Sequence, residues 1–253
     1  MRAYLEWGSQ KVLIDRIEPT HYVRNYLVLK LIKKYTTKYG TRKVCEIGCG
    51  TGSLSVEIGK LGLKVDASDP DKNAVELAKR FNSHRNVIYS SKNAIALKSS
   101  RKYDMAIAIE VIEHIKEDEK ALLEISKALK GNGLLVVTVP IHEKYGKEFD
   151  NRSGHIRRYE PEELIRKIKK AGFAVVYARH FNFPFLWLWY FFVYLPYSDK
   201  KEIQMKCSKS RMKRLPAWIG ILKIINKLLL IDLLFDSKEL STEMLVIARK
   251  VSI

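Results

Sequence analysis

The residues best suited to chemistry lie in the turn Glu46-Ile47-Gly48-Cys49-Gly50-Thr51-Gly52 and at Asp69, 23 positions after Glu46. Glycines let the main chain approach a ligand closely, and a helix beginning at Ser53 would open with backbone N–H groups that have no partner inside the helix. A carboxylate about 20 residues beyond such a turn accepts the ribose hydroxyls of the nucleotide in dinucleotide folds. The turn and Asp69 together predict a site for a ligand that contains adenosine.

A strand, a turn and a helix must position these residues. The apolar run 43–47 predicts a first strand, residues 53–61 have helical spacing, and residues 64–68 predict a second strand that delivers Asp69 at its carboxyl end. This order is the context that a nucleotide-binding loop needs. The spacing argues against a dinucleotide, because Gly-x-Gly-x-x-Gly makes room for a pyrophosphate and here the third glycine comes one residue early.

With these motifs, the chain from about Lys43 to Phe181 resembles a class I S-adenosylmethionine-dependent methyltransferase domain. The similar group includes the ubiquinone-biosynthesis O-methyltransferases and the type 11 and 12 methyltransferases. The resemblance implies an α/β, Rossmann-like, doubly wound seven-stranded sheet whose last strand is antiparallel. It also implies S-adenosylmethionine as cofactor and S-adenosylhomocysteine as product.

The resemblance further implies which residues hold the cofactor. Glu46, Gly48 and Gly50 would face its methionyl part, Asp69 its ribose, and Asn93-Ala94 the adenine edge. Asn93 departs from the family pattern, in which an Asp is common. The complete predicted set is Glu46, Gly48, Cys49, Gly50, Gly52, Asp69, Asn93, Ala94 and Glu110.

A second set of polar residues follows the apolar run 103–110, which predicts a buried parallel strand with Glu110, Glu113 and His114 at its carboxyl end. Ligands bind beside such strand ends in open α/β sheets. With the distant His155, these residues resemble the divalent-metal set of small-RNA 3′-end methyltransferases, and their oxygen and imidazole ligands would suit Mg²⁺, Mn²⁺ or Zn²⁺. The alternative, which we favour, is that Glu113 and His114 only begin the connection to the next helix and bind no metal.

Methyl transfer to a hydroxyl requires a base, and imidazole titrates near neutrality. His155, in the segment Gly154-His155-Ile156-Arg157-Arg158-Tyr159, is our first candidate for this base. His142, just after the strand expected at 134–140, is the second, and Glu113 is a further catalytic candidate. The alternative for His155 is that it only orders its loop together with Arg157 and Tyr159.

The segment between the strands expected at 174–179 and 243–249 is unusual. Residues 183–195 are 13 residues without charge and dense in aromatics, too few for a bilayer-spanning helix, which needs about 20. Residues 197–227 contain nine Lys or Arg and two acids, and residues 215–235 place Lys223, Asn226 and Lys227 on one helical side. This pattern favours an in-plane membrane element near anionic headgroups, while the alternative is a helical lid packed on the core.

The composition suits one α/β domain with an insertion, since the chain has 253 residues of which 47% are hydrophobic. We expect an N-terminal helical cap (1–42), a cofactor-binding core (43–181), the insertion (182–240) and a final core strand (241–253). Three cysteines support neither a disulfide framework nor a zinc cluster, and the first residues lack a secretory signal. We therefore expect a cytoplasmic protein, with peripheral contact to the inner face of the cytoplasmic membrane.

The formal charge of +18 attracts phosphate-rich partners, either RNA or anionic lipid. The resemblance and the apolar insertion favour O-methylation of a hydrophobic, lipid-linked, quinone or glycan acceptor. One alternative is an RNA 2′-O-methyltransferase, with or without a metal. Another is a non-catalytic, membrane-docked protein that binds the cofactor without turnover.

Overall fold

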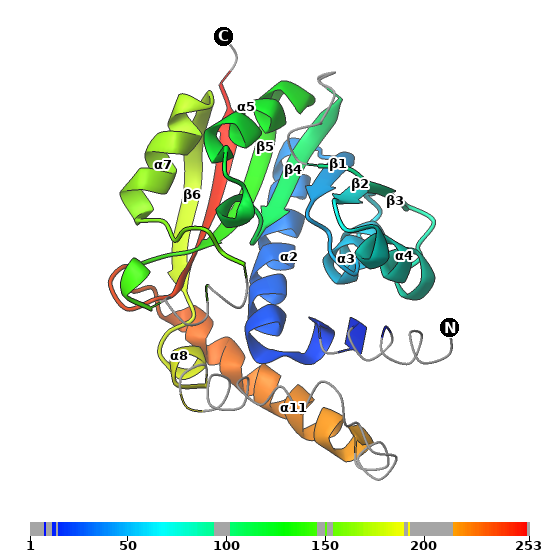
Figure 1. Ribbon diagram of the computed structural model, residues 1–253, viewed down its shortest axis with the longest axis vertical. Coiled ribbons are helices and arrows are strands. Elements are labelled where there is room, and N and C mark those ends of the chain that lie inside the picture. Colours follow the sequence, from blue (N-terminus) through cyan, green and yellow to red (C-terminus); the bar gives the residue numbers. More distant parts are fainter. Residues whose placement is uncertain are drawn as a thin grey trace.

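The computed structural model describes residues 8, 12–13, 15–93, 102–145, 150, 154–189, 192 and 215–251, with the backbone alone for 215–219. One seven-stranded sheet has the order β3-β2-β1-β4-β5-β7-β6 and carries helices on both faces (Figure 1). The strands are β1 (Lys43–Ile47), β2 (Lys64–Asp69), β3 (Val87–Ser91), β4 (Tyr103–Ile109), β5 (Leu129–Pro140), β6 (Phe173–Phe181) and β7 (Glu243–Lys250). The helices of the core are α2 (Pro19–Tyr39), α3 (Ser53–Lys60), α4 (Lys72–Phe81), α5 (Asp118–Ala128) and α7 (Pro161–Lys170).

The sheet is parallel from β3 to β5, and β7 runs antiparallel to both of its neighbours, β5 and β6. The predicted fold class, including the antiparallel last strand, is therefore confirmed. Strand β1 lies between β2 and β4, so the chain moves to one side of β1 and later returns to the other. Open α/β sheets bind ligands in the crevice at such a switch point, beside the carboxyl ends of the strands.

The strands bury both of their faces, which explains their apolar sequences. In β1, Val44 belongs to a hydrophobic cluster that includes Leu27 and Leu31 of α2. Its neighbour Cys45 belongs to a second cluster on the other face, with Leu122 of α5. Successive side chains of a strand point to opposite faces, so one short strand contributes to both clusters.

Two elements begin at different residues from those expected. Helix α2 starts at Pro19 rather than Tyr22, because the Glu18 carboxylate accepts the backbone N–H of His21 at 2.8 Å and a proline in the first turn has no hydrogen bond to lose. Strand β5 starts at Leu129 rather than at residue 134, because Leu129 pairs with Tyr103 before a register shift in β4.

The insertion lies between β6 and β7, as predicted, and contributes α8 (Phe185–Trp189), α11 (Leu215–Leu229) and the 3₁₀ helix η6 (Leu230–Leu234). The buried Asp232 carboxylate joins η6 to α8, since it accepts the backbone N–H groups of Phe185 at 3.0 Å and Leu186 at 2.6 Å. Residues 190, 191 and 193–214, which include part of the predicted aromatic run and most of the basic stretch, lie outside the described residues. Among the helices that are described, none has the length and apolarity to span a membrane.

Candidate functional site

The glycine turn after β1 adopts a conformation that side chains would disturb. Gly48, Gly50 and Gly52 have φ values of 69°, 51° and 79°. A Cβ on Gly48 would lie 2.4 Å from a methyl of Val111, and one on Gly52 would lie 2.6 Å from the Tyr89 hydroxyl. A Cβ on Gly50 would meet nothing within 4 Å, so the turn is packed on two sides and open in the middle. An open glycine backbone is what close approach by a ligand requires.

Asp69 ends β2 beside this turn, where its carboxylate is held by two backbone groups. Its Oδ2 accepts the N–H of Gly50 at 2.9 Å, and its Oδ1 accepts the N–H of Asp71 at 2.9 Å. A carboxylate oxygen has more than one acceptor site, so these bonds orient Asp69 and leave it able to accept ribose hydroxyls. The hydrogen bond to Gly50 also couples the acid directly to the turn.

Glu46 is the buried acid of the turn. Its side chain is 3% exposed, and its Oε2 has no hydrogen-bond partner among the described residues. Burial raises the pKa of Glu46 to about 7, because a low-dielectric environment disfavours the charged form. A buried carboxylate with one oxygen that has no hydrogen bond in the described chain, next to an open glycine, fits the ammonium group of a methionyl tail. The residues present therefore suit S-adenosylmethionine.

A cavity of about 890 Å³ lies at the switch point of the sheet. Its lining includes Gly48, Asp69, Asn93 and Glu110 from the predicted cofactor set, together with His114. Glu46, Cys49, Gly50 and Gly52 belong to the adjoining turn and are not among the lining residues. Burial raises the pKa of the Cys49 thiol. Ala94 lies outside the part of the chain that the structure describes.

Glu110 stands at the carboxyl end of β4, between the cavity and the N-terminal helix. Its φ is +54°, its Oε1 accepts the Thr138 hydroxyl at 2.8 Å, and its Oε2 lies 3.5 Å from a guanidinium nitrogen of Arg24. The same Arg24 nitrogen lies 3.0 Å from Glu243, the first residue of β7. This buried arginine therefore ties α2 to two strands at the edge of the site. Sequence reasoning missed Arg24 and Glu243, because 219 positions separate them and neither lies in a motif.

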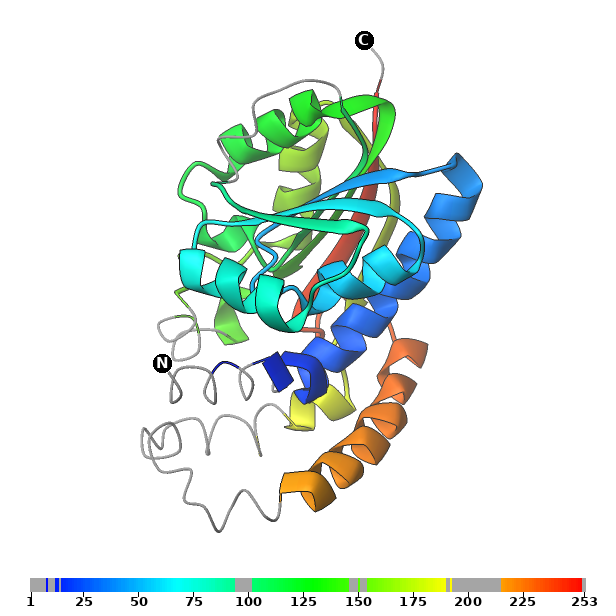
Figure 2. The ribbon, with the colours of Figure 1, turned by 90° about the vertical axis from the view of Figure 1, so that its right-hand side faces the viewer.

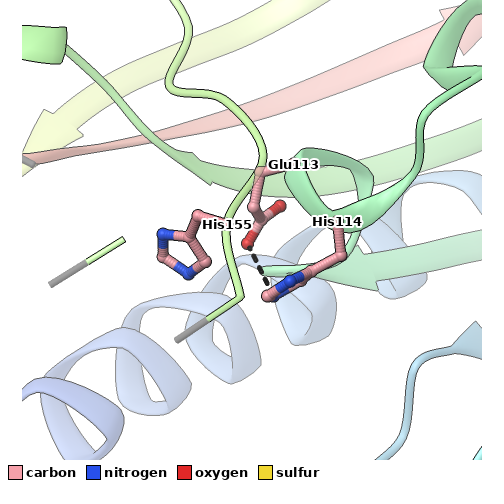
Figure 3. A group of neighbouring side chains, drawn as sticks. All are labelled: Glu113, His114 and His155. Carbon is pink, nitrogen blue, oxygen red and sulfur yellow. Dashed lines mark ion pairs between the residues drawn. The ribbon is translucent and has the colours of Figure 1, made fainter. Parts of the chain in front are cut away.

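Three of the four predicted metal ligands come together. One ligand atom from each of Glu113, His114 and His155 lies within 4.8 Å of the others (Figure 3). Glu113 is fully buried, neither of its oxygens has a hydrogen-bond partner in the described chain, and burial near Glu110 raises its pKa well above the usual range. Glu110 itself is not in this group, because its carboxylate pairs with Arg24 instead.

Hydrogen bonds define the role of the Nδ1 atom in each of the two histidines beside Glu113. The Nδ1–H of His114 donates to the Gly154 carbonyl at 2.9 Å, and the Nδ1–H of His155 donates to Asp150 at 2.9 Å. Because both partners accept, Nδ1 of each ring is the protonated nitrogen, and Nε2 is the atom that could bind a metal or a proton. Burial lowers the pKa of His155, although the bond to Asp150 opposes this change. His155 is therefore a neutral imidazole near pH 7, as a general base should be.

Asp150 is itself oriented by Arg158, whose Nε lies 3.0 and 2.9 Å from the two carboxylate oxygens. Sequence reasoning also missed this pair. The second candidate base, His142, sits elsewhere: its Nδ1 lies 3.1 Å from Glu160 and its Nε2 lies 2.6 Å from the Lys238 carbonyl. Both ring nitrogens of His142 are thus engaged in joining the strand end to the loop before β7. Neither His142 nor His155 lines the cavity directly, but the His155 ring contacts that of His114, which does.

The comparisons with known proteins agree with this geometry. A family model described as "Methyltransferase domain" matches residues 20–178. A ubiquinone biosynthesis O-methyltransferase of Rickettsia akari is 28% identical over 128 residues, which cover 50% of each chain. One of Pelagibacter ubique is 34% identical over 98 residues, covering 38% of this chain and 40% of the relative. The chain thus spans about half the length, or less, of these curated relatives.

The same fold recurs among solved structures. Phosphoethanolamine N-methyltransferase 2 of Haemonchus contortus, in complex with S-adenosyl-L-methionine, superposes with a TM-score of 0.62 at 20% sequence identity. That match covers 92% of this chain and 54% of the other. The family match, the glycine turn and the acid at the end of β2 lead to one conclusion: this chain belongs to the methyltransferase-domain family.

Proposed function

We propose that this chain is an S-adenosylmethionine-dependent methyltransferase and that it methylates an oxygen atom of a hydrophobic acceptor, such as a lipid-linked, quinone or glycan molecule. The observation that carries the proposal is the pair His155–Asp150, which orients the His155 imidazole against the ring of His114, a residue that lines the cavity. A hydroxyl acceptor must lose a proton, and this imidazole is suited to receive it. The named O-methyltransferase relatives and the apolar insertion support an acceptor of this class.

In the proposed reaction, bound S-adenosylmethionine supplies a methyl group on a positively charged sulfur. Asp69 would hold the ribose, Glu46 would face the methionyl ammonium, and Asn93 would face the adenine edge. The acceptor oxygen would form a bond to the methyl carbon while the carbon–sulfur bond breaks, and Nε2 of His155 would take the hydroxyl proton. The protein contributes mainly by aligning the two reactants in a pocket that excludes water.

The substitution His155→Ala tests this role. We expect S-adenosylhomocysteine affinity to stay within about twofold and turnover to fall by about 10²-fold, the scale of a lost general base. His84→Ala is the matched control, because His84 lies between α4 and β3 and its ring Nδ1 accepts the local backbone N–H of Asn86 at 3.2 Å. Turnover of the His155 variant equal to that of the control would remove His155 as the base.

The acceptor class is tested by incubating the protein with methyl-labelled S-adenosylmethionine and an extract of its source cells, then separating lipid, RNA and protein. Label in the lipid fraction supports the proposal. Label in RNA contradicts it and supports the RNA 2′-O-methyltransferase alternative. Binding of the cofactor without label in any fraction would support the non-catalytic alternative.

A metal-dependent form of the reaction is a second candidate, favoured by the buried Glu113 carboxylate, which lies beside two imidazoles and whose Oε1 is 3.8 Å from Nε2 of His114. Glu113, His114 and His155 would hold the ion, and a divalent cation there would lower the pKa of an acceptor hydroxyl. Activity abolished by a chelator and restored by Mg²⁺, Mn²⁺ or Zn²⁺ supports this form. Activity that is unchanged after chelation refutes it.

The proposal also includes a location. A cytoplasmic protein that acts on an acceptor stored in the membrane would bind the inner face of the cytoplasmic membrane peripherally, through residues 182–235. Fractionation of source cells checks this location: protein that salt or carbonate releases from the membrane pellet agrees with it, and protein found only in the supernatant contradicts it.

A further inference from the structure

One face of α11 and η6 exposes a row of aliphatic side chains. Ile221, Ile224, Leu228 and Ile231 recur at spacings of three and four residues, and Leu234 follows in η6. Their exposed fractions are 47%, 63%, 67%, 46% and 79% in that order. Spacings of three and four residues place side chains on one side of a helix, so this aliphatic row forms a continuous apolar stripe.

The opposite side of α11 is fixed to the protein, so the helix cannot turn to bury the row. Leu229 packs with Val23 of α2 and Leu186 of α8, and Ile225 packs against the same cluster. Asn226 is 1% exposed and its side chain donates to the Ile17 carbonyl at 2.9 Å. The sequence placed Asn226 beside Lys223 and Lys227 on one polar side. The structure instead uses it to anchor the buried side of the helix, which lies beside α2 (Figure 2).

The charges around the row have one sign. Lys223 and Lys227 are exposed next to it, and the single acid of residues 215–235 is Asp232, which is buried and caps α8. The basic stretch 197–214 precedes α11 in the sequence with seven Lys or Arg and two acids. A second copy of this chain packed on the row would bring the lysines of both helices together with no exposed acid of α11 to oppose them. An anionic bilayer offers both acyl chains for the row and phosphates for the lysines.

We propose that α11 is the element that docks on the membrane, lying in the plane of an anionic bilayer with the aliphatic row among the acyl chains and Lys223 and Lys227 at the headgroup phosphates. This inference deepens the peripheral contact in the proposed function by naming its face and the lipid charge. The insertion lies beyond the end of the sheet to which the arrowhead of β4 points (Figure 1). Docking therefore turns the carboxyl edge of the sheet, and its cavity, toward the bilayer.

Helix α2 links this surface to the site through two adjacent residues. Val23 packs against the insertion residues Leu186 and Leu229, while Arg24 pairs with Glu110 on the cavity wall. The bilayer-facing helix is therefore one helix away from the cavity, which suits delivery of an acceptor from the membrane.

Flotation with vesicles tests the inference, using phosphatidylcholine alone and phosphatidylcholine mixed with an equal part of phosphatidylglycerol. We expect the parent protein to float with the mixed vesicles and the double variant Ile224→Asp/Leu228→Asp to bind them about tenfold more weakly. Ile88→Asp is the matched control, because Ile88 is 67% exposed on the edge strand β3, away from α11. It should float like the parent.

A second variant, Lys223→Glu/Lys227→Glu, should lose affinity for the mixed vesicles and keep any affinity for the neutral ones. Unchanged S-adenosylhomocysteine binding shows that each variant is folded. Flotation of Ile224→Asp/Leu228→Asp equal to the parent overturns the inference. A parent that ignores vesicles and sediments as a dimer, which the same variant dissociates, overturns it in favour of a second copy. Methyl transfer is not measured here, so failure of this test leaves the proposed reaction standing.

Discussion

The substitution Glu46→Gln should stabilise the cofactor-free protein and weaken its binding of cofactor. Burial raises the pKa of Glu46 from an ordinary value of 4.5 to about 7 in the folded chain. Between these values the folded protein holds a proton that the unfolded chain has lost, so the free energy of unfolding falls as the pH rises. A pKa difference of this size corresponds to about 3 kcal/mol. The parent should lose this amount between about pH 4.5 and 7, whereas glutamine does not titrate.

Urea unfolding at a series of pH values measures this effect as the difference between Glu46→Gln and the parent. The difference should be small near pH 4.5, grow in favour of the variant up to about pH 7, and then stay constant at about 3 kcal/mol. Other titrating groups occur in both proteins and cancel in the difference. Glu57→Gln is the control for removing a carboxylate from an exposed position, since the Glu57 side chain is 43% exposed on α3 and pairs with Lys60.

Binding of S-adenosylhomocysteine provides the second half of the test. The ammonium of the ligand favours the ionised carboxylate, so the affinity of the parent should rise with pH up to about 7, and that of Glu46→Gln should stay low and flat. A variant that is less stable than the parent at pH 8, or a stability difference that does not change with pH, would refute the conclusion that burial raises the pKa of Glu46.

Two further predictions concern residues around the cavity. Asp69→Ala should weaken S-adenosylhomocysteine binding about a hundredfold by calorimetry, because charge-assisted hydrogen bonds to the ribose are lost. Asp66→Ala on the same strand, where the acid pairs with Lys43 and Lys102, should bind like the parent, and equal affinities for the two variants would remove Asp69 from the site. Arg24→Leu should lower the free energy of unfolding by about 3 kcal/mol in urea, because it removes the cation that the Glu110 carboxylate and the buried Glu243 carboxylate share. Adding Glu243→Gln should recover part of that loss, and an Arg24→Leu variant as stable as the parent would contradict the buried pairing.

Much of the candidate cofactor site could be predicted from the sequence, because the residues that form it lie close together in the chain. The seven residues from Glu46 to Gly52 contain an acid and three glycines, and they lead directly into a helix. Asp69 follows at the end of the next strand, and parallel strands bring their carboxyl ends to one edge. The structure places Gly48, Asp69, Asn93 and Glu110 around one cavity. Their individual contacts with the cofactor stay predictions.

The choice between the candidate bases depended on contacts between residues that lie far apart in the chain. The sequence offered His142 and His155 as bases without a means to separate them, since both stand in loops after strands. The structure shows that His142 bonds to Glu160 and Lys238, whereas His155 joins Glu113 and His114. Its partner Asp150 and the support from Arg158 depend on the path of one loop, which no spacing rule describes.

The sequence by itself determined the class of this protein, because a glycine turn between a strand and a helix, followed by an acid, is a pattern of neighbouring residues with a direct physical meaning. It also determined that the insertion is apolar and basic. Only the tertiary structure decided which side chains of the insertion are buried, because helical spacing fixes relative angles around a helix and not its rotation against the core. The contact of α11 with α2 sets that rotation: it buries Asn226 and leaves the row from Ile221 to Leu234 exposed. In the same way, only packing could place Arg24 between Glu110 and Glu243, since the energy of a buried charge depends on partners brought together from distant parts of the chain.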